Sequence, residues 1–326
     1  MTAPLLPIKL QLLALDRVHF PRTFHSARER ALFFQAASLV HRSWTADAQA
    51  RLPEHVAFEI SWPSNKLEWQ LDRLEEKTSS NGRGMKRLEL WWSPQMKNCA
   101  TLILGLAFRF PDIQELSLRR CASRTNRAED FAALNSAGRE DETPRDIMLG
   151  LSLDDLPQGL RFLSLAHIEV EMADLHAVAR LPHLETLLLT DLAFQLMHWF
   201  NLPYPSLRIL GVKSSRAYFS AGFLPLLAGS VKHLALVGLP VATIDDYRAS
   251  YASLPSRLES FLVHLAPVYA GYGDDPDSPN FIESEVNLKR CGEAANVRVS
   301  VKRNATPEEV DAFDLEEWAL SVGQLS

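Results

Sequence analysis

Histidine and cysteine are the residues of this chain best suited to metal binding or catalysis, but their spacing supports neither role. Cys99, Cys121 and Cys291 lie far apart, so they have no metal-ligand spacing and cannot form a disulfide framework. The histidines are scattered along the chain, among them His167, His176, His198, His233 and His264. There is also no glycine-rich phosphate loop, no H-E-x-x-H and no G-x-S-x-G motif. We therefore expect a protein that is not an enzyme and needs no metal or cofactor.

The side chains that remain for function are suited to binding another protein. Apolar residues recur at strand positions that would normally face water, and charged residues surround them. Such an arrangement, an apolar centre within a polar rim, is typical of an interface. The predicted target-binding site consists of Phe162, Leu188, Ile209, Lys213, His233 and Val237. The predicted rim consists of Arg161, Glu185, Arg208, Lys213 and Lys232.

An alternative interpretation is that a loop or a terminal segment of the chain itself covers these apolar residues. The target-binding interpretation predicts that changing Leu188 and Ile209 to Asp leaves the fold nearly intact.

A repeated apolar pattern must position these side chains. The pattern L-x-x-L-x-L recurs with its fourth residue at Leu163, Leu187, Leu210 and Leu234, at steps of 24, 23 and 24 residues. This period and pattern are typical of leucine-rich repeats, in which each unit contributes one strand of a parallel sheet. Because side chains alternate along a strand, the fourth and sixth residues point inward and the third and fifth point outward. The sequence therefore predicts an α/β fold, a solenoid with a curved parallel sheet and helices on the convex side.

The same frame extends in both directions and defines a solenoid over residues 56–303. Further units fall at 85–90, 113–118 and 258–263, with less regular strands at 56–60 and 297–301. The 47-residue step from Leu116 to Leu163 leaves two possibilities, a degenerate unit near 147–151 or an insertion. The polar, charged run at 122–146 favours an insertion. Residues 271–279 are predicted to form an acidic loop.

The first 55 residues carry a different pattern. Leu6-Pro7 begins a helical stretch that continues through Leu10, and Ser38-Leu39-Val40-His41-Arg42-Ser43-Trp44 lies in a second one. Together these blocks resemble the F-box of F-box leucine-rich-repeat proteins. Two features depart from the family pattern: Lys9 stands where an acidic residue is usual, and the linker between the helices is longer.

This resemblance implies a partner and a role for the N-terminal segment. An F-box docks onto the Skp-type adaptor of a cullin-RING ubiquitin ligase. The residues that would contact the adaptor are Leu6, Pro7, Leu10, Leu39, Val40 and Trp44. The expected function is that of a substrate-recognition subunit of an SCF-type ligase, binding an unknown target protein on the concave face. The alternative is an F-box-independent leucine-rich-repeat scaffold whose N-terminal helices only cap the solenoid.

Composition narrows the partners further. The chain has 326 residues, a formal net charge of -6 and a pI of about 5.9, which argues against a nucleic-acid partner. No apolar run is long enough to span a membrane. A reducing compartment, cytoplasmic and/or nuclear, is expected from the three unpatterned cysteines.

Several helices are predicted around the strands. Amphipathic patterns indicate helices at 66–77, after Ser93-Pro94 and at 173–180. Thr306-Pro307-Glu308-Glu309 has the form of a capping box with proline in the first turn. Residues 304–326 are therefore predicted to form one capping helix that closes the open end of the last repeat.

Overall fold

The computed structural model describes residues 54–60, 84–92, 109–120, 156–167, 172–191, 204–213, 230–240, 257–266, 279–303 and 305–323. Isolated helical positions at 35, 36, 39, 44 and 45, and at 69, 72, 73, 75 and 76, are also described.

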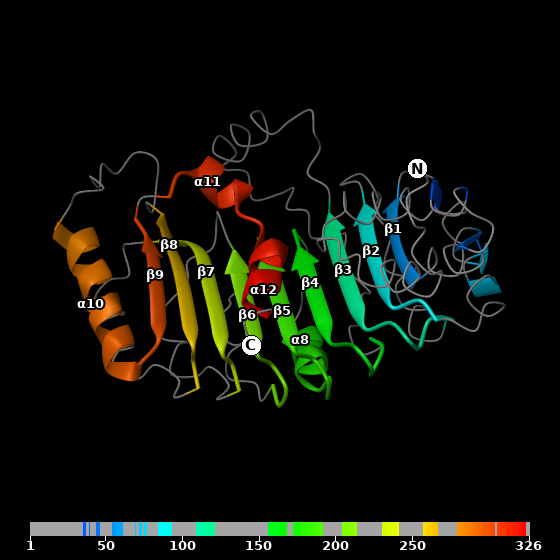
Figure 1. Cartoon of the computed structure of the whole chain (residues 1–326), viewed down its shortest axis with the longest axis horizontal. Helices are drawn as coiled ribbons and strands as arrows, with labels where there is room; N and C mark the ends of the chain where they lie inside the picture. Colours follow the sequence, from blue (N-terminus) through cyan, green and yellow to red (C-terminus); the bar gives the residue numbers. More distant parts are fainter. Residues whose placement is uncertain are drawn as a thin grey trace, which may run out of the picture.

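One open, all-parallel sheet dominates the described structure (Figure 1). Its nine strands follow one another in sequence order, each hydrogen-bonded to the next. They are β1 (His55–Ile60), β2 (Arg87–Trp92), β3 (Glu115–Arg120), β4 (Phe162–Ala166), β5 (Thr186–Thr190), β6 (Ile209–Lys213), β7 (His233–Pro240), β8 (Ser260–Ala266) and β9 (Arg298–Lys302). This order is that of a solenoid-like α/β fold. After each strand the chain returns to the end of the sheet where that strand began, so the next strand runs parallel to it.

The strand register follows the sequence pattern and confirms the predicted alignment. Leu163 pairs with Leu187, which pairs with Leu210, and the same line continues through Leu234 to Phe261. Toward the N-terminus the line continues through Leu116, Leu88 and Val56, and at the other end it reaches Val299. The less regular strands expected at 56–60 and 297–301 are therefore part of the sheet.

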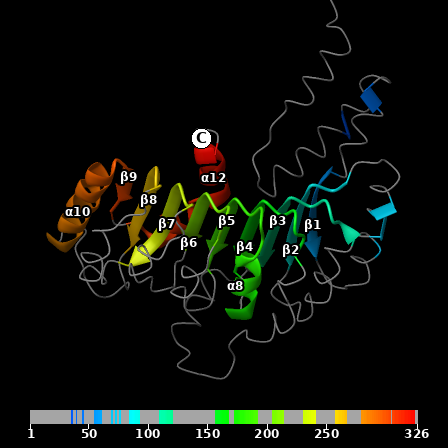
Figure 2. The same cartoon turned by 90° about the horizontal axis from the view of Figure 1, so that it is seen from below.

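The inward-facing side chains form a continuous core. Leu88, Leu116, Leu163 and Leu234 are all fully buried, as is each sixth residue from Leu90 to Val263. Helix α8 (Met172–Ala179) occupies the place predicted for a helix at 173–180, and its last residues are buried. Figure 2 shows that α8 lies on one face of the sheet and α12 (Leu315–Gly323) on the opposite face. The core beneath α8 thus lies on the back face of the sheet, and the third, fifth and seventh residues of the strand units lie on the front face.

Strands β3 and β4 are neighbours in the sheet although 47 residues separate Leu116 from Leu163. Strand β3 pairs directly with β4, with Leu116 opposite Leu163. Residues 147–151 lie outside the described residues, so a degenerate unit and an insertion both stay predictions for this step. The segment 122–146 itself lies outside the described residues, as does the acidic loop up to residue 278.

A helix that was not predicted from the sequence lies at the end of the sheet, against β9. Helix α10 (Pro279–Ala295) precedes β9 and contacts it, with Leu288 fully buried. Gly292 faces β9 so closely that a methyl group there would overlap the Val299 side chain. The C-terminal helix therefore does not close this end of the sheet, and that prediction is wrong.

The C-terminal residues instead form two short helices over the front face. Helix α11 (Pro307–Ala312) begins with the predicted capping box, in which Thr306 and Glu309 bond reciprocally through their backbone and side-chain groups. It ends at Phe313, whose extended backbone breaks the helix. Asp314 then starts α12 by accepting hydrogen bonds from the Glu316 and Glu317 amides. The single tail helix predicted from the sequence is thus two helices joined by a capped turn.

Candidate protein-binding face

The front face of the sheet, formed by the third, fifth and seventh residue of each strand unit, holds every residue of the predicted target site. Its middle row runs in register across eight strands: Glu89, Ser117, Ser164, Leu188, Gly211, Ala235, Leu262 and Ser300. Between Ser117 and Ala235 only Leu188 has a large side chain. Small side chains allow another element to approach the strand backbones closely in this part of the sheet.

The C-terminal segment, residues 305–323, packs into this part of the front face. Helix α12 contacts β5 and β6, while α11 contacts β7 (Figure 1). The buried cluster between them consists of Phe162, Leu188, Ile209, Ala235, Val237, Ala305, Val310, Leu315 and Ala319. Leu262, Phe313, Trp318 and Val322 pack around it and are partly buried. The molecule therefore has a second apolar core on the side of the sheet that a regular solenoid leaves to solvent.

Gly211 makes the close approach of α12 possible. A methyl group on its Cα would lie 2.9 Å from Leu188 Cδ2 and 3.0 Å from Leu315 Cδ2. Trp318 would be the next neighbour, at 3.4 Å. Any side chain at position 211 would therefore compete for the space that the two helix residues use.

Lys213 holds the junction between α11 and α12. Its Nζ donates hydrogen bonds to the carbonyl oxygens of Asp311 at 2.7 Å and Phe313 at 2.9 Å. Carbonyl groups at a helix C-terminus lack intrahelical donors, so an ammonium group satisfies them and complements the helix dipole. Burial lowers the pKa of Lys213, an effect that the nearby Asp191 and Asp311 carboxylates oppose.

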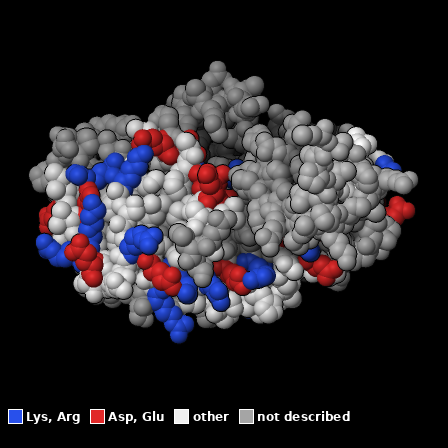
Figure 3. Space-filling view, viewed as in Figure 1, with Lys and Arg blue, Asp and Glu red and all other residues white. Residues whose placement is uncertain are grey.

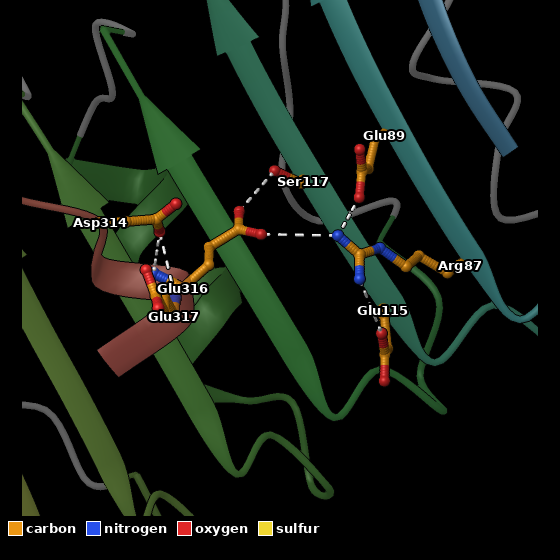
Figure 4. Close-up of polar contacts among 7 residues, drawn as sticks. All are labelled: Arg87, Glu89, Glu115, Ser117, Asp314, Glu316 and Glu317. Carbon is orange, nitrogen blue, oxygen red and sulfur yellow. Dashed lines mark hydrogen bonds and ion pairs between the residues drawn. The ribbon is translucent and has the colours of Figure 1, made fainter. Parts of the chain in front are cut away.

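Glu316, in the first turn of α12, is the polar anchor at the other end of the segment (Figure 4). Ser117 Oγ donates to its Oε1 at 3.1 Å, and Arg87 Nη2 lies 3.5 Å from its Oε2. The residue is only 4% exposed. A carboxylate at this depth is tolerated only with such donors around it.

Arg87 is shared among three carboxylates. Besides Glu316 it contacts Glu89 on its own strand and Glu115 on the next, the latter at 3.9 Å (Figure 4). One Glu89 oxygen, Oε2, is buried without a hydrogen-bond partner among the described residues. Because Arg87 interacts with three carboxylates, its effect on Glu316 alone is reduced. Burial is therefore the larger effect and raises the pKa of Glu316, while the positive charges of Arg87 and Arg119 oppose this rise.

The upper part of the front face adds contacts to α11. The ring of His264 packs edge-on against Phe313, with 4.8 Å between ring centroids. Lys302 on β9 forms an ion pair with Glu309 at 3.0 Å. Burial lowers the pKa of His264, and the Lys302 charge lowers it further. His264 Nδ1 has no hydrogen-bond partner among the described residues, so the imidazole contributes packing more than polar bonding here.

The six predicted target-binding residues are therefore assembled on one face, as the sequence indicated, but they are not open to solvent. Their exposed fractions run from zero to 9%, in the set Phe162, Leu188, Ile209, Lys213, His233 and Val237. The expectation of solvent contact is wrong because the C-terminal segment covers the apolar members. The alternative, a terminal segment over the face, is confirmed, and the binding role of these residues stays a prediction.

Only some of the charged residues predicted to surround the target site lie at its solvent-exposed border. Arg161 pairs with Glu185 at 2.8 Å and Lys232 pairs with Glu259 at 2.6 Å, each across one repeat step. Figure 3 shows charged groups of both signs along the lower border of this face. Arg208 is exposed, whereas Lys213 is buried beneath the segment.

Two of the predicted adaptor-binding residues can be placed. Leu39 is helical and 86% exposed, and Trp44 is helical and half-buried. Leu6, Pro7, Leu10 and Val40 lie outside the described residues. A single exposed leucine is common on protein surfaces. The nearly complete exposure of the Leu39 side chain makes it available for contact with a partner.

Three further findings bear on function. Among the described residues no group of histidine, cysteine, aspartate or glutamate side chains is arranged to hold a metal ion. None of the helices in the described part of the chain has the length and apolar character needed to cross a membrane. No model of a known protein family matches the chain, and no curated protein matches it either.

Proposed function

We propose that this chain is a substrate-recognition subunit of an SCF-type ubiquitin ligase, built from an F-box-like N-terminal segment and an irregular leucine-rich-repeat solenoid. The solenoid part of the proposal is supported by nine parallel strands in sequence order, and by the inward leucines of β4 to β7, which recur at steps of 23 to 24 residues. The ligase part is supported by the resemblance of residues 38–44 to the second conserved block of the F-box. A fold alone does not establish a function, so the proposal needs support from particular binding residues.

The observation that carries the proposal is the exposure of Leu39. In the F-box resemblance this leucine contacts the adaptor, and here its side chain is 86% exposed on a helical stretch. Burying a leucine against a partner contributes about 1.5–3 kcal/mol, roughly a 10- to 150-fold effect on the dissociation constant. A free surface leucine therefore makes a sensitive probe of adaptor binding.

The test is a binding measurement between the purified full-length chain and a Skp-type adaptor. Leu39→Asp should weaken binding by at least tenfold without changing the melting temperature by more than about 2 °C, because an exposed position contributes little to stability. The matched control is Ile282→Asp, which places the same charge at another exposed apolar helix position, 42% exposed on α10. This control should bind like the wild type.

Two results would contradict the proposal. If the folded wild-type chain does not bind the adaptor, the ligase role is refuted, and the F-box-independent scaffold becomes the better description. If Leu39→Asp and Ile282→Asp bind equally well, the segment around Leu39 is not the docking surface.

A further inference from the structure

The docking site on the front face accepts one particular shape, a short helix. The row from Ser117 to Ala235 has space above its backbone only because of serine, glycine and alanine side chains, and a helix is the element that fills it. Leu315 and Trp318 lie against Gly211, and Ala319 belongs to the same buried cluster as Leu188. The sheet is thus complementary to an apolar helix face with one small residue.

Polar contacts fix the direction and position of that helix. Ser117 and Arg87 receive a carboxylate from its first turn, and Lys213 receives the carbonyl groups that immediately precede it. These groups would meet the same atoms on any helix with an acidic first turn that lies in the same direction. The recognition elements belong to the sheet, so the segment occupies a site with the features of a peptide-binding site.

The segment itself is poorly suited to hold a fixed position without the sheet. Its two helices have six and nine residues, and helices of this length are marginal in water on their own. It also enters the face from the end of β9, held near that point by the Ala305 amide bonded to the Leu265 carbonyl at 2.8 Å and by the Lys302–Glu309 pair. Residues 306–323 can therefore leave the face while the strand β9 stays in the sheet.

We propose that the C-terminal segment is an intramolecular competitor of the target protein, and that the target binds the same site as a short amphipathic helix with a carboxylate in the place of Glu316. This inference rests on the proposed function for the existence of a target, and it assigns that target a chemical class. Arg87 and Ser117 select the acidic first turn, and Gly211 selects a close-packed helix face. The front face is then accessible only in the fraction of molecules in which the segment has opened, which lowers the apparent affinity for a target accordingly.

The test uses the full-length chain and a fluorescent synthetic peptide of residues 305–323 as the probe. Leu315→Asp should undock the segment without touching the sheet, since an aspartate cannot be buried against Leu188 and Gly211. The variant should bind the peptide at least tenfold more tightly than the wild type does. A peptide carrying Glu316→Lys should lose at least tenfold in affinity for the same variant, because Arg87 would then face a like charge.

Folded Leu315→Asp protein that binds neither peptide would overturn the inference, and so would equal binding of the two peptides. If the variant does not fold, hydrogen exchange of the wild-type chain decides. Amides of α12 that exchange by local opening, well before those of β5 and β6, support the inference, whereas exchange only through global unfolding overturns it. The adaptor is absent from these assays, so loss of adaptor binding by Leu39→Asp and peptide binding by Leu315→Asp succeed or fail independently.

Discussion

Changing Leu188 to Asp should detach the C-terminal segment from the front face. Leu188 is 1% exposed and lies close to Gly211, as does Leu315 of α12. Removing its apolar contacts sacrifices about 1.5–3 kcal/mol of burial. A carboxylate left under α12 would add a further penalty of several kcal/mol. The protein avoids that penalty by releasing the segment, because position 188 then faces water.

The loss of stability caused by Leu188→Asp therefore cannot exceed the free energy with which the C-terminal segment docks on the sheet. Ordering the segment costs about 1–2 kcal/mol per residue in backbone entropy, which offsets most of the gain from burying Val310, Leu315 and Ala319. A loss of 2–3 kcal/mol or more at one contact is then enough to shift the docking equilibrium. The back-face core, where Leu187 and Leu189 remain buried, should keep the sheet intact.

Hydrogen exchange combined with urea unfolding checks this expectation. Leu188→Asp should abolish protection of the α11 and α12 amides while protection in β4 to β6 persists. Ser300→Asp is the matched control: position 300 lies in the same row of the same face, is exposed, and is outside the C-terminal cluster. Unchanged protection of α12 in Leu188→Asp would refute the described packing, and complete unfolding would show that the segment and sheet form one cooperative unit.

Three further expectations concern polar contacts of the segment. Lys213→Met keeps the aliphatic stem but leaves two helix-end carbonyls without their donor, so it should destabilise the protein to urea by about 1–3 kcal/mol, against less than about 1 kcal/mol for the surface-paired Lys232→Met. The pKa of His264 is depressed by burial and by Lys302, so docking should be intact above its ordinary pKa of 6.5 and weaken as the pH falls below it, through the lowered pKa. Exchange of the α11 amides measured against pH should show this, and His264→Gln should abolish it. Burial raises the pKa of Glu316 against the opposing effect of Arg87, so docking of α12 should be strongest below the ordinary glutamate pKa. It should weaken as the pH rises through the raised pKa, to the level that the Ser117 and Arg87 contacts with the carboxylate maintain. Glu316→Gln should remove that part of the pH dependence of α12 exchange.

The strands were predictable from the sequence because their determinants are local and periodic. The inward pair in each L-x-x-L-x-L unit must lie on the same side, and a shift by one residue would expose every such pair. Leu163, Leu187, Leu210 and Leu234 therefore aligned in the sheet as the pattern required. The capping box at Thr306 was equally local and is present.

The closed front face was not predictable in the same way. Apolar residues at outward positions, such as Leu188 and Ile209, indicate that something covers them but not what. The answer lies more than a hundred residues further along the chain, in the spacing of Val310, Leu315 and Ala319. Asp314 followed by two glutamates is a helix-start signal that could have divided the tail into two helices. The sequence pattern for helix α10 is weaker, because two of its apolar residues, Ile282 and Val286, are exposed and so do not mark a buried face.

The buried charges beneath α12 fix the position of the helix on the sheet more than they stabilise the fold. Replacing a buried ion pair by apolar residues is often neutral or stabilising, so the Arg87–Glu316 contact is weak evidence of a need for stability. What it does determine is register: Glu316 can meet Ser117 and Arg87 together in only one position of the helix along the sheet. A helix held by apolar contacts alone could slide over the Ser, Gly and Ala positions of the row. A site that must be occupied in one register, and that accepts its ligand through a carboxylate, a helix end and a close-packed face, has the selectivity expected of a recognition surface. Under the proposed function, the C-terminal segment is the sequence with which a target would compete for this face.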